Sequence, residues 1–152
     1  MATGTGPRVE EIAHELFEVV TQICLSALRG RRRADDLKEV EFLTLSILHA
    51  RGTMIVGGIQ RLLGILPAQM SRVIRALESR ERPYITCQIN SRDKRKIDVC
   101  LTAMGEKVLQ DYRDVRVGRI VELLRNLPDE EQEDLVRLLD KLHHLLAGSK
   151  AT

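Results

Sequence analysis

The side chains best suited to chemistry lie on one face of a predicted helix, Leu66–Glu78. Apolar residues at Met70, Ile74 and Leu77 recur with helical spacing, which predicts that the opposite face of this helix is buried. The face away from this apolar stripe carries Ala68, Arg72, Arg75 and Ser79, and Gln69 and Ser71 flank it. Amide and guanidinium groups form paired hydrogen bonds with adenine and guanine, so the pattern favours a helix that reads base edges in a DNA major groove. A solvated amphipathic helix is the alternative, because such faces are common.

A basic hairpin follows this helix in the sequence. Apolar and polar residues alternate in Tyr84–Asn90 and again in Ile97–Leu101, which predicts two strands. The turn between the strands holds four basic residues, Arg92, Lys94, Arg95 and Lys96. Before the base-reading helix, Gly57–Gly64 has the length of a short helix, and Pro67 suits the first position of the next one. Two such helices followed by a basic hairpin indicate a winged helix-turn-helix fold.

The hairpin and the residues after it resemble the multiple-antibiotic-resistance regulators, the MarR family. That family has a wing signature of the form D-x-R-x-x-x-V-x-L-T-x-x-G. This chain has the matching residue at all six positions, Asp93, Arg95, Val99, Leu101, Thr102 and Gly105. The resemblance extends over residues 8–147 and is strongest over 59–105. It implies a homodimeric transcriptional regulator, a repressor, that binds an inverted repeat in double-stranded DNA.

The resemblance also implies roles for the candidate residues. In the family the wing arginine reaches the minor groove, which here is Arg95, and Asp93 would orient it through an ion pair. Phosphate contacts are expected from the other basic residues, Arg75, Arg92, Lys94 and Lys96. Base contacts are expected from Gln69, Ser71 and Arg72, and Ala68 is expected to face the DNA beside them. Relatives often release DNA when a small, often phenolic, molecule enters the crevice between the dimer helices and the winged domain, so a small-molecule effector is expected here as well.

Charge is unevenly distributed along the chain. The whole sequence has 24 Lys and Arg against 22 Asp and Glu, a net charge of only +2. Residues 51–102 hold 10 of the basic and 4 of the acidic residues, which gives this segment a net charge of +6 and the rest of the chain −4. Binding to a polyanion requires such a local concentration of positive charge. The charge distribution therefore supports DNA as the partner of residues 51–102.

Helical spacing elsewhere predicts further helices. One runs from residue 8 to about residue 28, and a second covers 37–50, capped by Asp35 or Asp36. A third begins after the cap Thr102 and ends near residue 126, and a Leu-rich fourth begins at Asp129, after Pro128. Residues 53–56 are predicted to add a short strand to the hairpin. The expected fold class is mainly α with a small β-hairpin wing, a winged helix-turn-helix core with N- and C-terminal dimerisation helices.

The apolar residues of the terminal helices exceed what one small domain can cover. We therefore predict a mobile tail at 1–7, a helical dimerisation region at 8–30 and 105–147, and a winged helix-turn-helix DNA-binding domain at 35–104. Between the first helix and the winged domain lies Arg31–Arg33, which is interpreted as a solvated loop, with phosphate contact as the alternative.

Patterns for other kinds of chemistry are missing from the sequence. It has no G-x-S-x-G, no H-E-x-x-H and no phosphate-binding glycine loop, so we expect neither enzyme activity nor a cofactor. The four His and three Cys have no metal-ligand spacing, so no metal site is expected. No apolar run approaches the roughly 18 residues of a membrane span, and the first residues have no apolar signal core. We therefore expect a cytoplasmic protein that does not bind membranes.

The three cysteines leave alternatives open. Cys24 lies on the first predicted helix, where some MarR-like regulators sense peroxide, and a small buried hydrophobe is the other interpretation. Alternation places Cys87 and Cys100 on opposite faces of the hairpin, which predicts no disulfide between them. Two functions remain beside the ligand-released repressor. One is a regulator switched by oxidation of Cys24, and the other is a winged-helix protein-interaction module without specific DNA binding.

Overall fold

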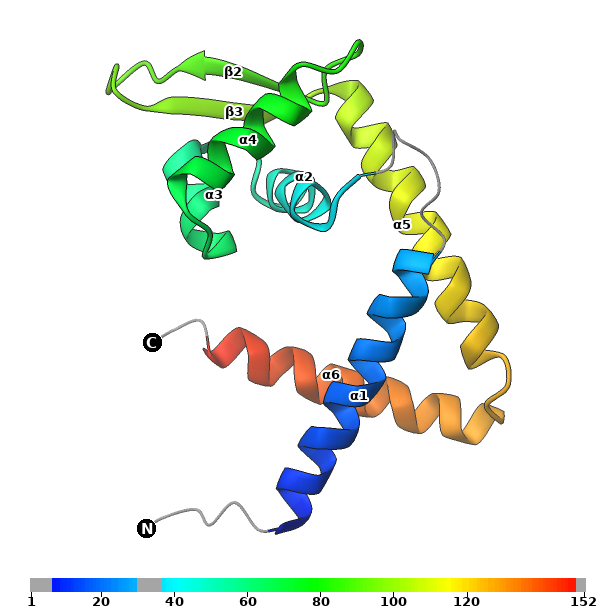
Figure 1. The fold of residues 1–152 in the computed structure, drawn as a ribbon. Helices are drawn as coiled ribbons and strands as arrows, with labels where there is room; N and C mark the ends of the chain where they lie inside the picture. The colour runs from blue at the N-terminus through cyan, green and yellow to red at the C-terminus, as the bar shows by residue number, and fades with distance from the viewer. Residues whose placement is uncertain (1–6, 30–36, 150–152) are drawn as a thin grey trace, which may run out of the picture.

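The computed structural model describes residues 7–29 and 37–149, shown as a ribbon in Figure 1. The chain forms helices joined by a small sheet, in the order α1 Pro7–Arg29, α2 Glu39–Arg51, β1 Met54–Ile55, α3 Val56–Leu63, α4 Pro67–Glu78, β2 Ile85–Ile89, β3 Ile97–Leu101, α5 Ala103–Leu124 and α6 Asp129–Gly148. These elements confirm the predicted fold class, mainly α with a β-hairpin wing. Of the predicted mobile tail, residues 1–6 lie outside the described residues, as does Arg31–Arg33, and α1 begins at Pro7.

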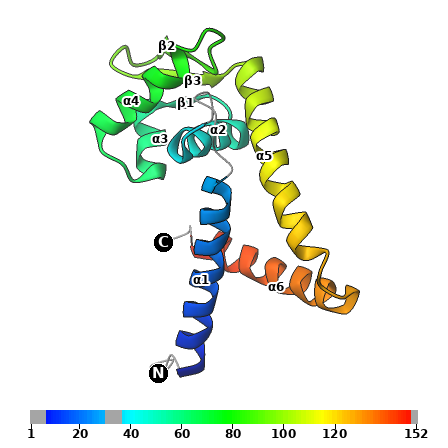
Figure 2. The same cartoon turned by 45° about the vertical axis from the view of Figure 1, so that its right-hand side comes forward.

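The sheet is antiparallel, with β3 between β1 and β2. Val99 at the centre of β3 pairs with Met54 of β1 and with Cys87 of β2. Helices α2, α3 and α4 pack together beside the sheet (Figure 2). Within the described part of the chain, the buried apolar side chains fall between positions 37 and 109: Leu37, Leu45, Leu48, Ile59, Met70, Val73, Leu77, Tyr84, Ile85, Val99 and Leu109. One continuous core therefore holds α2–α4, the sheet and the first turns of α5 in a fixed arrangement.

Two residues of the wing signature fix the passage from the sheet into α5. The hydroxyl of Thr102 accepts a hydrogen bond from the Gly105 N–H at 3.0 Å, which confirms the predicted N-cap. The same hydroxyl donates to the carbonyl oxygen of Pro83 at 2.6 Å. A Cβ at Gly105 would lie 2.1 Å from the carbonyl oxygen of Tyr84, the residue before β2. Only glycine therefore allows α5 to approach the start of β2 so closely. The wing and α5 are thus joined rigidly.

The start of α2 differs from the prediction. The proposed caps, Asp35 and Asp36, lie outside the described residues, and the helix begins at Glu39 instead of Leu37. The Glu41 carboxylate accepts a hydrogen bond from the backbone N–H of Lys38 at 2.9 Å, and so satisfies a donor at the helix start. Glu41 is only 3% exposed and forms an ion pair with Arg80, which follows α4, at 3.5 Å. This carboxylate therefore serves both as a cap and as a tie between α2 and the end of α4.

Helices α1 and α6 extend away from the winged unit, which consists of α2, α3, α4 and the sheet, and α5 connects that unit to α6 (Figures 1 and 2). None of residues 8–27 and 29 of α1 is buried, and neither is any residue of α6. Arg119 of α5 holds the end of α1, because its guanidinium donates to the carbonyl oxygens of Ser26 and Ala27 at 2.8 and 3.3 Å. The terminal helices thus depend on α5 for their connection to the rest of the chain.

Candidate nucleic-acid interface

Helix α4 presents the two faces that its sequence predicts. Met70, Val73 and Leu77 are buried against the core. The candidate base and phosphate contacts are all exposed, at Ala68, Gln69, Ser71, Arg72 and Arg75. Pro67 occupies the first turn of the helix, where its missing N–H costs nothing. The helix is therefore anchored on one side and accessible on the other, as a helix that enters a major groove must be.

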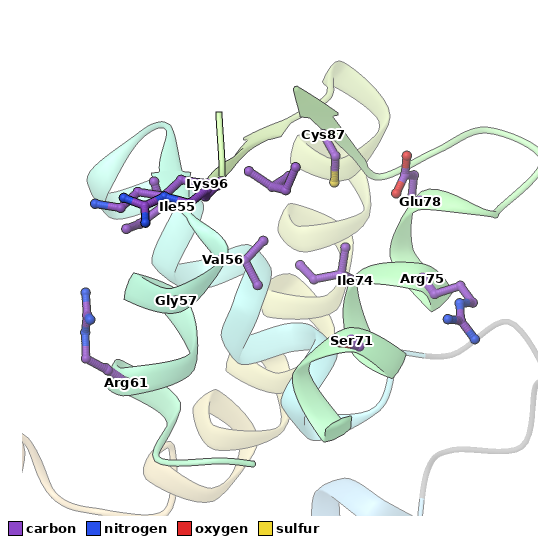
Figure 3. Close-up of a pocket in the computed structure, with 12 residues that line it drawn as sticks. Ile55, Val56, Gly57, Arg61, Ser71, Ile74, Arg75, Glu78, Cys87 and Lys96 are labelled. Atoms are coloured by element: carbon purple, nitrogen blue, oxygen red, sulfur yellow. The ribbon is translucent and has the colours of Figure 1, made fainter. Parts of the chain in front are cut away.

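A groove of about 720 Å³ separates α4 from the wing (Figure 3). In Figure 3, Val56 of α3 and Ile74 of α4 point into this groove from opposite sides. Basic side chains from three elements line it, Arg61 of α3, Arg75 of α4, and Arg95 and Lys96 of the wing. A strand of DNA backbone has the charge that such a groove attracts.

The structure separates the predicted site residues into groups. Ser71 and Arg75 line the groove together with the wing residues Arg95 and Lys96. Ala68, Gln69 and Arg72 are exposed on α4 outside this lining, and Arg92 and Lys94 are exposed at the wing tip. Arg61 was missed by the sequence analysis. Its signal was its position off the apolar Ile59, Leu62 and Leu63 face of a short helix, but only the folded chain brings it to the groove.

The wing tip is held by a set of hydrogen bonds. Arg95 pairs with Asp93, as expected, with 3.2 Å between its Nε and the Oδ1 of Asp93, and its backbone N–H donates to the same oxygen at 3.0 Å. These two hydrogen bonds, the backbone one first, lower the pKa of the Asp93 carboxyl below its usual value. Asp93 is therefore a stable anion at neutral pH, and it restrains an arginine that is 91% exposed.

The cysteines lie in three different surroundings and all are free thiols. Cys87 and Glu78 both line the groove (Figure 3). Burial first, and then the negative charge of Glu78, raise the pKa of the Cys87 thiol to about 11. Cys100 lies 3.0 Å from the hydroxyl of Thr53, and it pairs across the strands with Thr86 and not with Cys87. A thiol as weakly acidic as Cys87 is a poor nucleophile at neutral pH.

A second cavity lies between α1 and α5. Its volume is about 480 Å³, and mostly apolar side chains line it beside Arg116, Arg119 and the exposed Cys24. Within residues 7–29 and 37–149, no group of three or more His, Cys, Asp or Glu gathers in a way that could hold a metal ion. Over the same residues, no helix is long and apolar enough to cross a bilayer.

Comparison with known proteins gives consistent matches. The model of the MarR family matches residues 37–97. An uncharacterised HTH-type transcriptional regulator, YwaE of Bacillus subtilis, is 28% identical over 142 residues, which cover 88% of this chain and 81% of that protein.

Solved structures support the fold. The transcriptional regulator Tm0710 of Thermotoga maritima superposes with a TM-score of 0.73 at 18% identity, covering 94% of this chain and 99% of that one. The apo form of wild-type MarR from E. coli gives a TM-score of 0.69 at 20% identity, covering 88% of this chain and 95% of that one. At such identities the likeness concerns the fold, and the chemistry must come from the residues of this chain.

Proposed function

This chain belongs to the MarR family of winged helix-turn-helix transcriptional regulators, and from that membership we propose that it is a homodimeric repressor which binds a palindromic operator. The observation that carries the proposal is the basic groove between α4 and the wing, because its lining combines exposed helix residues with the wing arginine. A transcriptional regulator is generally not an enzyme, and we propose no catalytic step. The protein would act in the cytoplasm, where its DNA is.

In this proposal α4 enters the major groove and the wing enters the adjacent minor groove. Gln69, Ser71 and Arg72 contact base edges, and Ala68 packs beside them. Arg95, oriented by Asp93, enters the minor groove, whose narrow A·T stretches attract arginine. Phosphate contacts come from the other basic residues around the groove and on the wing, Arg61, Arg75, Arg92, Lys94 and Lys96.

The terminal helices supply the proposed dimer interface. On α1, apolar side chains at Ile12, Leu16 and Val19 are exposed on one helix face. On α6, exposed leucines follow helical spacing at 138, 139, 142, 145 and 146. A single chain leaves this apolar surface in contact with water, and a second copy related by a two-fold axis would bury it. The regions 8–30 and 105–147 therefore form the proposed dimerisation part, and 35–104 the DNA-binding part.

Release by a small molecule completes the proposal. The cavity between α1 and α5 has room for a small ligand, and it adjoins Arg116, which contacts α2 of the winged unit. An effector bound there could alter the placement of α4 relative to the dimer helices.

The test is to select genomic DNA fragments with the purified full-length protein and to footprint the recovered sites. A two-fold dimer places its two recognition helices about one helical turn apart, so we expect an inverted repeat with that spacing and an affinity that falls steeply with salt. An asymmetric single half-site would contradict the dimeric part. An absence of salt-dependent binding would contradict DNA recognition and favour the protein-interaction module.

A further inference from the structure

The wing arginine is attached to the molecule through a turn that needs its own support. Arg95 is restrained by Asp93, but both residues lie in the turn between β2 and β3. An ion pair within an exposed turn moves with that turn, so it cannot by itself fix the direction of Arg95 relative to the sheet. Some other contact must connect the turn to the strands.

Asn90 makes that connection at the end of β2. Its Oδ1 accepts hydrogen bonds from the backbone N–H groups of Arg92 and Asp93, both at 2.9 Å. Its Nδ2 donates to Oδ1 of Asp98, on β3, at 2.9 Å. Its backbone N–H donates to the Lys96 carbonyl oxygen, also at 2.9 Å. One half-buried side chain thus binds both the first part of the turn and the opposite strand.

These contacts form a continuous path from the sheet to the exposed guanidinium. The path runs from Asp98 through the Asn90 amide to the backbone of Asp93, and from the Asp93 carboxylate to Arg95. A carboxamide is required at the centre, because it must accept from two N–H groups and donate to a carboxylate at the same time. An aspartate there would place two carboxylates against each other.

We propose that Asn90 is the positioning residue of the wing, which holds the turn so that Arg95 is directed toward the DNA before binding. This inference rests on the proposed function, in which Arg95 contacts DNA. An arginine whose turn is already fixed loses less conformational freedom on binding, so the contact yields more affinity. Asn90 itself does not touch the DNA.

The first test measures how the effect of Asn90→Ala depends on Arg95. The full-length protein is titrated with its selected operator and with a random duplex of equal length at several salt concentrations. We expect Asn90→Ala to weaken both affinities about threefold to tenfold and to lower the salt slope, because the guanidinium contact is lost part of the time. In an Arg95→Ala background the same substitution should cost clearly less, because only the phosphate contacts of the other basic residues on the turn are left to be weakened. A merely structural role of Asn90 would produce the same loss in both backgrounds.

The second test reverses the hydrogen bond to the sheet. Asn90→Asp alone should weaken binding, because the new carboxylate faces Asp98. Combining Asn90→Asp with Asp98→Asn restores one donor and one acceptor in the reverse direction at unchanged net charge. We expect the combined variant to recover operator affinity to within about twofold of the wild type. This pair keeps the inference testable even if Asn90→Ala fails to fold.

The outcomes separate this inference from the function on which it rests. If Arg95→Ala leaves affinity and salt slope unchanged, the proposed wing contact is wrong and the role of Asn90 falls with it. If Arg95→Ala weakens binding but Asn90→Ala does not, or if the loss persists unchanged in the Arg95→Ala background, the DNA contact stands and the inference about Asn90 is overturned. Failure of the combined variant to recover would equally contradict the proposed path.

Discussion

Leu45 of α2 and Leu145 of α6 belong to the same chain, but the first is completely buried and the second is 70% exposed. Among the residues whose burial the structure describes, every buried apolar side chain lies between positions 37 and 109, within the winged unit and the first turns of α5. The terminal helices contain a comparable supply of Leu, Ile and Val, and the single chain leaves most of it exposed. Burial of apolar surface is the main stabilising contribution to folding, so the two regions must reach stability by different routes.

The winged unit obtains its stability within one chain, and we propose that the terminal helices obtain theirs between two chains. A helix that forms few tertiary contacts is marginally stable in water, because helix nucleation is costly and most helix stability comes from packing. Two copies would cover the exposed stripes and set the distance between the two α4 helices. Dimer formation and operator spacing would then be properties of the same residues.

A cluster around Arg116 joins the two regions. Its guanidinium forms an ion pair with Glu39 of α2, with 2.7 Å between Nη2 and Oε2. It also lies over the rings of Tyr112 and Phe42, which stack with 4.5 Å between their centroids. Arg119, one turn later, binds the end of α1. This part of α5 therefore contacts both the end of α1 and the start of α2.

Removal of α6 should have the largest effect. Deleting residues 129–152 removes α6, and with it the exposed leucines that the dimer is proposed to bury on this helix. We expect an aggregating or unfolded product with no operator binding, measured by light scattering and gel shift. A soluble, folded monomer that still binds the operator would contradict the comparison between the two regions.

A matched pair of leucine truncations should sharpen the comparison. Leu45→Ala removes a fully buried side chain and should cost about 2–5 kcal/mol. Leu142→Ala, on α6, should cost about 1–2 kcal/mol if a partner covers it and less than about 0.5 kcal/mol if it faces water.

Chemical denaturation at several protein concentrations measures both variants. The loss in Leu142→Ala should appear together with weaker dimerisation, whereas Leu45→Ala should leave dimerisation unchanged. A cost below about 0.5 kcal/mol for Leu142→Ala, with dimerisation unchanged, would show that the terminal helices are not covered.

The smallest effect concerns the reactivity of Cys87 in the winged unit. Because burial and Glu78 raise its pKa to about 11, the folded protein keeps this thiol neutral through pH 9, near which an ordinary cysteine is half ionised. In a Cys24→Ser, Cys100→Ser background, the alkylation rate should rise about tenfold per pH unit between pH 7 and 9.5 without levelling.

The denatured protein provides the control for this measurement, because its rate should level near pH 9. Glu78→Gln should lower the pKa part of the way, since burial is the larger cause. A folded-state profile identical to the denatured one would contradict the closed environment of Cys87.

Local signals account for most of what could be predicted about the fold. The apolar period and the breakers Gly64, Pro67 and Pro128 placed the helices within a few residues of their observed ends. Thr102 was recognisable as a cap from its position before a helical pattern, and its hydrogen bond to Gly105 confirms it. These features depend on residues close in sequence, and this is why they could be read directly.

Contacts between distant residues could not be predicted in the same way. Glu41 and Arg80 are 39 positions apart, and nothing local marks the glutamate as buried. Arg61 reaches the groove only because α3 packs beside the wing. Asn90 reaches Asp98 only through the hairpin register, in which Asp98 pairs with Gln88, and no local pattern in the sequence marks that contact. The organisation of the wing tip was therefore missed, although its basic residues were found.

The most direct test of the account compares Arg72→Ala with Arg95→Ala on operator and random duplexes across a salt series. Arg72 lies on the exposed face of α4, so its loss should cost about 1–3 kcal/mol on the operator and flatten base preference at one position per half-site. Arg95 lies on the wing, so its loss should weaken operator and random DNA together, with specificity lost only in the flanking A·T content. The salt slope should fall by roughly one unit per wing. Unchanged affinities and an unchanged salt slope for a folded Arg95→Ala protein would contradict the proposed DNA contact of the wing. An equal loss of affinity on both duplexes for Arg72→Ala would contradict base reading by α4.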